Sequence, residues 1–282
     1  MTRKGGEMMR FLLALVVGLS SVGLAQEGVE ELLSRAEAAY DRWHGEFDFP
    51  SYEGRLREAI QLWEKALPEL SQPTERHDVL VKLSRAWFEL AEGYLEEKED
   101  AYAKGKDYAL SALRLDPVFR ETEGREGFRA ALRKSTDVEA LFWYGNNLGR
   151  WLSYHYWEAL VGGTRDVLAA FERCVELDEK YWAAGPHRAL ANFLAQTPGF
   201  LGGDFERAKG EFARAVELAP EFLQNYVDYA EHWAKKAGDQ SLFCELLGKA
   251  LALAQDPGAV SAWPFYNHLA LERAKGLARG CP

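Results

Sequence analysis

The stretch ERAKGEFARAVELAP, residues 206–220, has a spacing that indicates how the chain folds. The small residue Ala208 is followed four positions later by the bulky Phe212 and three positions after that by the small Ala215. Pro220 comes five positions further on. Small residues on one side of a helix let a neighbouring helix approach closely, and the proline ends the helix before the next pair begins. The stretch therefore predicts the second helix of a helical hairpin.

The same spacing recurs along the chain, which is typical of tetratricopeptide repeats. Looser copies are Ala59–Trp63–Ala66, Gly105–Ala109–Ala112–Pro117, Val167–Phe171–Cys174 and Phe243–Leu247–Ala250. The closing small residues lie 46, 62, 41 and 35 positions apart, and only the last interval is near the roughly 34 residues of a regular array. Alternating strand patterns are missing. We therefore expect an all-α solenoid of degenerate tetratricopeptide-like hairpins, forming a single domain over residues 26–282.

Two insertions interrupt the predicted repeats. The longer one lies between Pro117 and Thr164, and the shorter one, AQTPGFLGGD at residues 195–204, lengthens the turn within one hairpin. Insertions in a solenoid emerge on one face and build sites there. They favour a specialised protein over a plain repeat array.

The first 25 residues read as a signal peptide. Arg3, Lys4 and Arg10 precede the uncharged run FLLALVVGLSSVGLA, and small residues precede a cleavage point before Gln26. The alternative is a membrane anchor, but 15 uncharged residues fall short of the roughly 20 that a spanning helix needs. Translation from Met8 or Met9 in place of Met1 gives the same interpretation. No cysteine lies near the cleavage point, so we expect no lipoprotein anchor, and we expect an exported, periplasmic protein.

Charge and the absence of motifs exclude several functions. The formal net charge is −10, and removal of residues 1–25 takes away three basic residues and one acidic residue, which leaves −12. So acidic a chain is a poor ligand for nucleic acid or an anionic membrane. The six histidines are scattered, and no nucleotide-binding loop, serine-hydrolase motif or dinucleotide fingerprint occurs. We expect no enzymatic activity, no metal and no cofactor.

The three cysteines permit at most one disulfide, with one thiol left over. Cys174 and Cys244 both fall inside amphipathic helical patterns, so we expect them to be small buried apolar residues. The spacing does not decide whether Cys281 pairs with either of them.

An aromatic stretch, FWYGNNLGRWLSYHYW at residues 142–157, is the main candidate for a binding site. On a helix, Asn146, Arg150 and Ser153 form a polar stripe between two apolar faces. One interpretation is core packing, with Arg150 paired to an acidic neighbour. The other is a ligand cavity, in which aromatic walls supply apolar contact, Arg150 binds a carboxylate and the asparagines donate and accept. The candidate ligand-binding residues are Trp143, Asn146, Asn147, Arg150 and Trp151.

A second candidate is YWAAGPHRALANF, residues 181–193. Pro186 is expected to start a helix, which places His187 and Arg188 in its first turn, where a basic group opposes the helix dipole. A carboxylate of the protein or an anionic ligand at the helix start would offset that cost. An ordinary surface salt bridge is the alternative. His187 and Arg188 are therefore second-choice ligand residues.

Three blocks together resemble one family, the T component associated with TRAP transporters (TatT-like). The blocks are LFWYGNNLGRW at 141–151, GPHRALANFLAQTPGFLGGDFERAKGEFARAVELAP at 185–220 and NYVDYAEHWAKKAGD at 225–239. The resemblance implies cryptic helical repeats that enclose a hydrophobic cavity or pore, and self-association into a small ring, with a trimer expected. It implies partnership with the periplasmic solute-binding protein of a TRAP system, which carries small organic acids or related ligands.

The resemblance and the residues lead to one leading hypothesis and one alternative. We expect a periplasmic accessory component of TRAP-type uptake that holds or passes a small hydrophobic or carboxylate ligand. The alternative is a general repeat adaptor that docks peptides or envelope proteins in a concave groove. An enclosed aromatic cavity favours the first, and an open superhelix with a polar groove favours the second.

Overall fold

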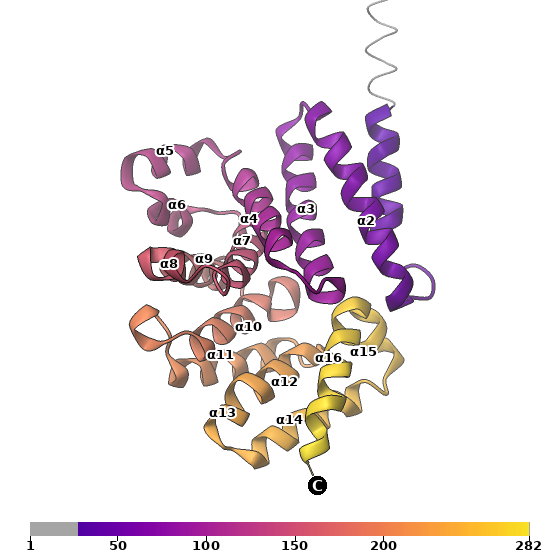
Figure 1. Ribbon diagram of the computed structural model, residues 1–282, viewed down its shortest axis with the longest axis vertical. Coiled ribbons are helices and arrows are strands. Elements are labelled where there is room, and N and C mark those ends of the chain that lie inside the picture. The colour runs from indigo at the N-terminus through magenta and orange to yellow at the C-terminus, as the bar shows by residue number, and fades with distance from the viewer. Residues whose placement is uncertain (1–27, 282) are drawn as a thin grey trace, which may run out of the picture.

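The computed structural model describes residues 28–281, which form helices joined by turns; no strand occurs in that range (Figure 1). Local sequence explains many helix starts. Six helices follow an aspartate whose side chain accepts a hydrogen bond from a backbone N–H of the first turn, which satisfies a donor that the helix cannot pair itself. The expected all-α class is confirmed.

The helices pack as successive antiparallel pairs. The first pair is the helical segment 28–40 with α2 (Phe49–Ala66), followed by α3 (Pro73–Tyr94) with α4 (Glu99–Leu113) and α7 (Val138–Trp151) with α9 (Thr164–Leu177). Then come α10 (Tyr181–Gln196) with α11 (Phe205–Leu218), and α12 (Leu223–Tyr229), η4 (Ala230–Ala234) and α13 (Lys235–Ala237) with α14 (Gln240–Leu253). The short α15 (Pro257–Ala262) and α16 (Pro264–Leu277) end the chain. This is the tetratricopeptide-like solenoid that the spacing predicts.

The repeated motif falls on the second helix of each pair, as expected. Its small and bulky members on α2, α4, α9, α11 and α14 are all buried. Gly105 shows why a small residue is needed, because a Cβ there would lie 2.3 Å from Oδ1 of Asn147 on α7. The motif therefore records where neighbouring helices approach most closely.

The longer insertion is built differently from the sequence-based expectation. The extra helices are α5 (Pro117–Glu126), α6 (Phe128–Lys134) and the turn containing α8 (Tyr156–Glu158) and η2 (Ala159–Gly163). The aromatic helix α7 lies between them in sequence but is itself the first helix of a regular pair, packed on α4 and α9. The shorter insertion is, as predicted, a longer turn between α10 and α11, and it contains η3 (Gly199–Leu201).

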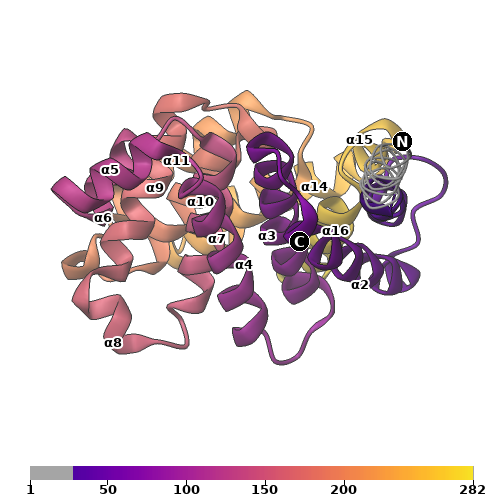
Figure 2. The same cartoon turned by 90° about the horizontal axis from the view of Figure 1, so that it is seen from above.

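The two ends of the solenoid meet. Figures 1 and 2 show the last helices, in yellow, next to the first ones, in indigo. The Trp43 indole donates a 2.8 Å hydrogen bond to the Ala262 carbonyl oxygen, and the Phe49 ring stacks on His268 with 4.1 Å between centroids. Buried Glu89 accepts from Tyr40 and Tyr266, which come from opposite ends of the chain. The hairpins therefore close on themselves, and one continuous apolar cluster runs from Ala36 to Ala274.

Two cysteines are paired. Cys244 and Cys281 form a disulfide that joins α14 to the last residues of the described chain, which is the pairing that the spacing left open. The expectation that Cys244 is a buried apolar residue is wrong, because it is only half-buried and is bonded to Cys281. Cys174 on α9 is free and fully buried, as expected, and burial raises the pKa of its thiol. The predicted signal peptide lies outside residues 28–281. Among the described helices, none is long and apolar enough to cross a membrane.

Candidate functional site

A cavity of about 420 Å³ lies inside the closed arrangement, between α3, α7, α9, α10, α12 and α16. Its size is that of pockets that hold a small molecule. Seven aromatic residues contribute to its wall: Phe88, Phe142, Trp143, Phe171, Trp182, Phe193 and Tyr266. The aromatic helix α7 therefore fits both interpretations of its sequence. One of its faces packs in the core, and another lines the cavity.

A close contact between two helices and a strained turn shape the cavity wall. Gly145 on α7 permits Phe171 of α9 to lie against the helix, since a Cβ would come within 2.6 Å of the ring. At the start of α10, Trp182, Ala183 and Ala184 have φ of 51°, 54° and 57°, a left-handed turn that non-glycine residues rarely adopt. The turn sets the Trp182 indole edge-to-face on Trp143, with 5.2 Å between centroids. Strain of about 1–3 kcal/mol per residue is found where a site must hold a fixed shape.

Arg150 lies in the wall as part of an ion pair. Its Nε and Nη2 contact the two carboxylate oxygens of Glu92 on α3 at 2.9 and 3.2 Å, and Tyr102 also donates to Glu92. The Glu92 charge raises the pKa of Arg150. Half of the Arg150 side chain is solvent-accessible, so the pair borders the cavity and is not sealed in the core.

Arg188 also lies in the wall and also has partners. Its Nη1 donates to Asn225 Oδ1 at 3.1 Å, and its Nε is 3.6 Å from Asp228 Oδ2. Burial lowers the pKa of this guanidinium despite the Asp228 charge. Burial alone would raise the pKa of Asp228, but Arg273, at 2.8 Å, together with His232, Arg188 and the Asn192 hydrogen bond outweighs it, so the pKa lies below its ordinary value. Burial also lowers the pKa of His232 in the same wall.

The seven residues singled out from the sequence divide into two groups. Four line the cavity: Trp143, Asn146, Arg150 and Arg188. Asn147, Trp151 and His187 are not among its lining residues. Asn147 is fully buried and donates to Ser84 and to the Trp143 carbonyl, so it ties α7 to α3. Trp151 stacks on His155 at 3.6 Å.

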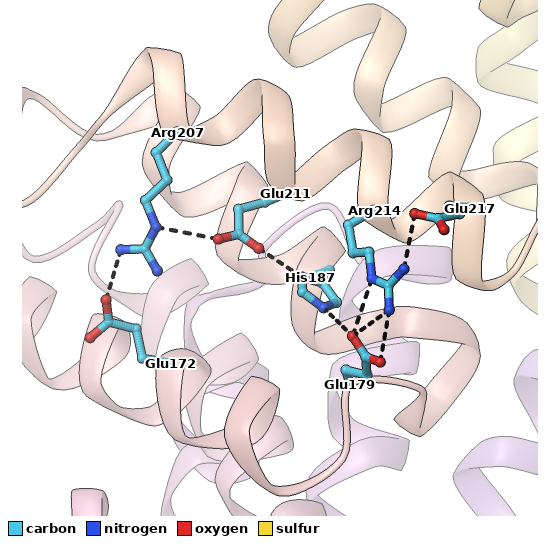
Figure 3. A network of polar contacts seen from close by, with 7 residues as sticks. All are labelled: Glu172, Glu179, His187, Arg207, Glu211, Arg214 and Glu217. Atoms are coloured by element: carbon cyan, nitrogen blue, oxygen red, sulfur yellow. Dashed lines mark hydrogen bonds and ion pairs between the residues drawn. The ribbon is translucent and has the colours of Figure 1, made fainter.

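His187 belongs to a charged network that joins α9, α10 and α11 (Figure 3). Its Nδ1 lies 2.7 Å from Glu211 and its Nε2 lies 3.3 Å from Glu179, and Arg207 and Arg214 hold these carboxylates in turn. The cost of a basic group at the helix start is therefore offset by carboxylates of the protein. This was one of the alternatives that the sequence left open for His187.

Several wall residues were not identified from the sequence. Glu92, Asn192 and Asp228 come from three helices far apart in the chain, and only the closure of the hairpins brings them together. Asp228 did leave a signal, since the two residues on each side of it, in YVDYA at 226–230, are apolar or aromatic. A carboxylate in such a helix requires a buried partner or a cavity.

Comparison with known proteins decides the family. The family model described as "TRAP transporter T-component" matches residues 88–280, more than half of the chain. The chain belongs to the TRAP transporter T-component family. The resemblance seen in the sequence is thereby confirmed, and the chain is an accessory component of TRAP transport.

The other comparisons are weaker. No curated protein is detectably similar in sequence. Among solved structures, the "TPR2AB-domain:pHSP90-complex of yeast Sti1" is similar with a TM-score of 0.33 and 16% identity, covering 86% of this chain and 99% of that one. A structure titled "Computational Design of Self-Assembling Cyclic Protein Homooligomers" has a TM-score of 0.18 and 16% identity, covering 94% and 97%. The T-component assignment depends on the family match alone.

Proposed function

We propose that this T component is a non-enzymatic periplasmic protein that docks an extracytoplasmic TRAP solute-binding protein and holds or passes a small apolar or organic-acid ligand. The observation that carries the proposal is the aromatic-walled cavity of about 420 Å³ inside the closed hairpins. A cavity of this size with aromatic walls suits a small ligand, whereas a peptide adaptor uses a long groove. The mature chain, residues 26–282, acts as one domain.

Export is supported by the sequence and by the cysteines. The predicted signal peptide at residues 1–25 directs the chain out of the cytoplasm. The Cys244–Cys281 disulfide is of a kind that persists in an oxidising compartment such as the periplasm. The two observations are independent of each other.

Exposed aromatic residues beside the cavity are the proposed docking surface. We call Tyr154, Tyr156, Trp157, Val161 and Phe200 the aromatic rim; each is at least half exposed. The rim lies on the two turns that also supply Ser153, Ala159 and Leu201 to the cavity wall. Large exposed apolar side chains beside a cavity mark interaction sites, and a partner docked here is placed to exchange ligand with the cavity.

A pull-down of the tagged mature protein from its native host, with mild cross-linking and mass spectrometry, tests the partnership. Recovery of an extracytoplasmic solute-binding protein, followed by co-elution of the two purified proteins, is the expected result. Trp157→Ser is expected to weaken co-elution, while the matched control Val118→Ser, an exposed apolar residue on α5, leaves it unchanged. Recovery of envelope-assembly factors or assorted peptides without a solute-binding protein would refute the proposal in favour of the adaptor.

Self-association is the remaining part of the proposal. The family resemblance implies a trimer, and light scattering during size-exclusion chromatography measures it directly. A mass three times that of the mature chain supports the trimer. A monomer mass at micromolar concentration contradicts it and leaves the docking and ligand proposals standing.

A further inference from the structure

Arg85 on α3 is a cation that forms no ion pair within residues 28–281, and we infer that it binds the carboxylate group of a small organic acid. Arg85 is not one of the residues that line the cavity, but its guanidinium packs against Trp182, which is. The site is therefore next to the cavity. The inference goes beyond the proposed function, because that proposal places the ligand in the cavity itself.

Two aromatic rings lie against the Arg85 guanidinium. Its Cζ is 4.7 Å from the centroid of the Tyr40 ring and 4.8 Å from that of the Trp182 ring. No hydrogen bond or ion pair joins Arg85 to another residue of the described chain, and its Nε is buried without a partner. Every other arginine in residues 28–281 that is not exposed makes at least one such bond.

The charge of Arg85 is not balanced by the buried groups around it. Glu89, one helical turn further along α3, is already bonded to Arg42 and to the phenols of Tyr40 and Tyr266. Burial raises the pKa of both phenols, that of Tyr40 to about 12, so neither is negatively charged at neutral pH. An arginine in a protein keeps its proton. Arg42, Arg85 and Glu89 together therefore carry one net positive charge, which one monovalent anion balances.

Only the end of the Arg85 side chain is accessible to a ligand. Arg42 Nη2 and Arg85 Nε are both buried, so a ligand does not reach them. The two Nη groups of Arg85 are not among the buried atoms, and the residue as a whole is half-buried. These two groups form a planar fork that matches the two oxygens of a carboxylate. Trp182 is also half-buried, and its ring offers contact to the apolar part of an organic acid.

The arginines of the cavity wall are in a different electrostatic position. Arg150 lies 2.9 Å from the Glu92 carboxylate, and Arg188 lies 3.6 Å from that of Asp228. A ligand carboxylate at either place would add a second negative charge beside the first, and the two would repel each other. At Arg85 the added charge completes the balance, so this is where we expect the acid group to bind.

Butyrate, butyramide and chloride, compared at equal ionic strength and neutral pH, test the site by isothermal titration calorimetry of the mature protein. Butyrate is expected to bind at least about tenfold more tightly than the other two, because it alone combines the charge, the paired oxygens and an apolar chain. Equal binding of chloride or butyramide would overturn the inference. So would the absence of butyrate binding at about 10 mM.

Four arginine variants locate the bound carboxylate. Arg85→Met should lower butyrate affinity at least about tenfold, and Arg85→Lys, which keeps the charge without the fork, should lower it less. Arg120→Met is the matched control, because Arg120 on α5 also makes no bond within residues 28–281 but is exposed, and no change is expected. If Arg150→Met lowers the affinity and Arg85→Met does not, the carboxylate binds in the cavity and the inference is wrong.

Urea unfolding separates binding from a structural role of Arg85. Butyrate that binds the folded protein raises its urea midpoint. This rise should occur in the unmodified protein and in Arg120→Met, and should be absent from Arg85→Met. A purely structural arginine would lower the midpoint of Arg85→Met in every solution and leave the rise with butyrate unchanged, which would refute the inference. Neither result bears on the solute-binding partner, which co-elution tests separately.

Discussion

Replacement of Glu89 by glutamine should destabilise the protein by about 3–5 kcal/mol. Glu89 is fully buried and accepts hydrogen bonds from Tyr40 at 2.8 Å, Arg42 at 3.0 Å and Tyr266 at 2.7 Å. Burial raises the pKa of Tyr40 to about 12, so that phenol keeps its proton and donates. Hydrogen bonds to a charged group contribute about 1.5–3 kcal/mol each, and the variant also leaves the Arg42 charge buried without a counter-ion.

Urea unfolding followed by tryptophan fluorescence measures the loss. Glu121→Gln is the control: its partner Arg125 lies one helical turn away, both side chains are mostly exposed, and the expected cost is about 0.5 kcal/mol or less. The double variant Arg42→Met with Glu89→Leu should recover much of the stability, since it removes both buried charges. A cost below about 1 kcal/mol for Glu89→Gln, or no recovery in the double variant, would refute the reasoning.

Three further predictions concern packing, cross-linking and acid. Gly105→Ala should cost about 1–3 kcal/mol in urea unfolding, because the new Cβ would lie 2.3 Å from Asn147 Oδ1; a neutral result would mean that α4 and α7 part freely. Cys244→Ser opens a disulfide that spans 37 residues and should lower the free energy of unfolding by about 3–4 kcal/mol. Reductant should cause the same loss in the unmodified protein and no further loss in the variant. His187 and Arg207 hold the pKa of Glu211 below its ordinary value although burial opposes them, so its stabilisation is present above about pH 4.5 and is lost as the pH falls through the folded pKa. The urea midpoint of Glu211→Gln should therefore fall less between about pH 5 and 3 than that of the unmodified protein, and parallel falls would contradict this.

The repeat architecture was predictable because it depends on close approach between neighbouring helices. Small residues such as Ala208 and Ala215 mark the close approach within one or two helical turns, so the signal is local in the sequence. Pro220 and Asp204 likewise mark a helix end and a helix start by local chemistry. What such signals do not contain is the angle between successive pairs, so the closure of the first pair onto α16 was not predictable.

The candidate site was predictable to the extent that it lies on one helix. The polar stripe of α7 identified Asn146 and Arg150, because a helical period is visible in the sequence. It could not separate Asn146, which lines the cavity, from the adjacent Asn147, which bonds to Ser84. Glu92 was missed because its role depends on the packing of α3 against α7, a contact between residues 58 positions apart.

The contact between the ends of the solenoid has a consequence for native-state dynamics. Hairpins in such arrays contact mainly their neighbours, so the hydrogen bond from Trp43 to Ala262 can break and the two end segments can unfold locally while the central hairpins stay folded. Such a partial opening has a lower free energy than global unfolding. In hydrogen exchange, the amides of segment 28–40 and of α15 should become exposed together, while those of α7 remain protected. The ring of hairpins then has a seam that opens on the timescale of this exchange, at a distance from the lining residues of the cavity.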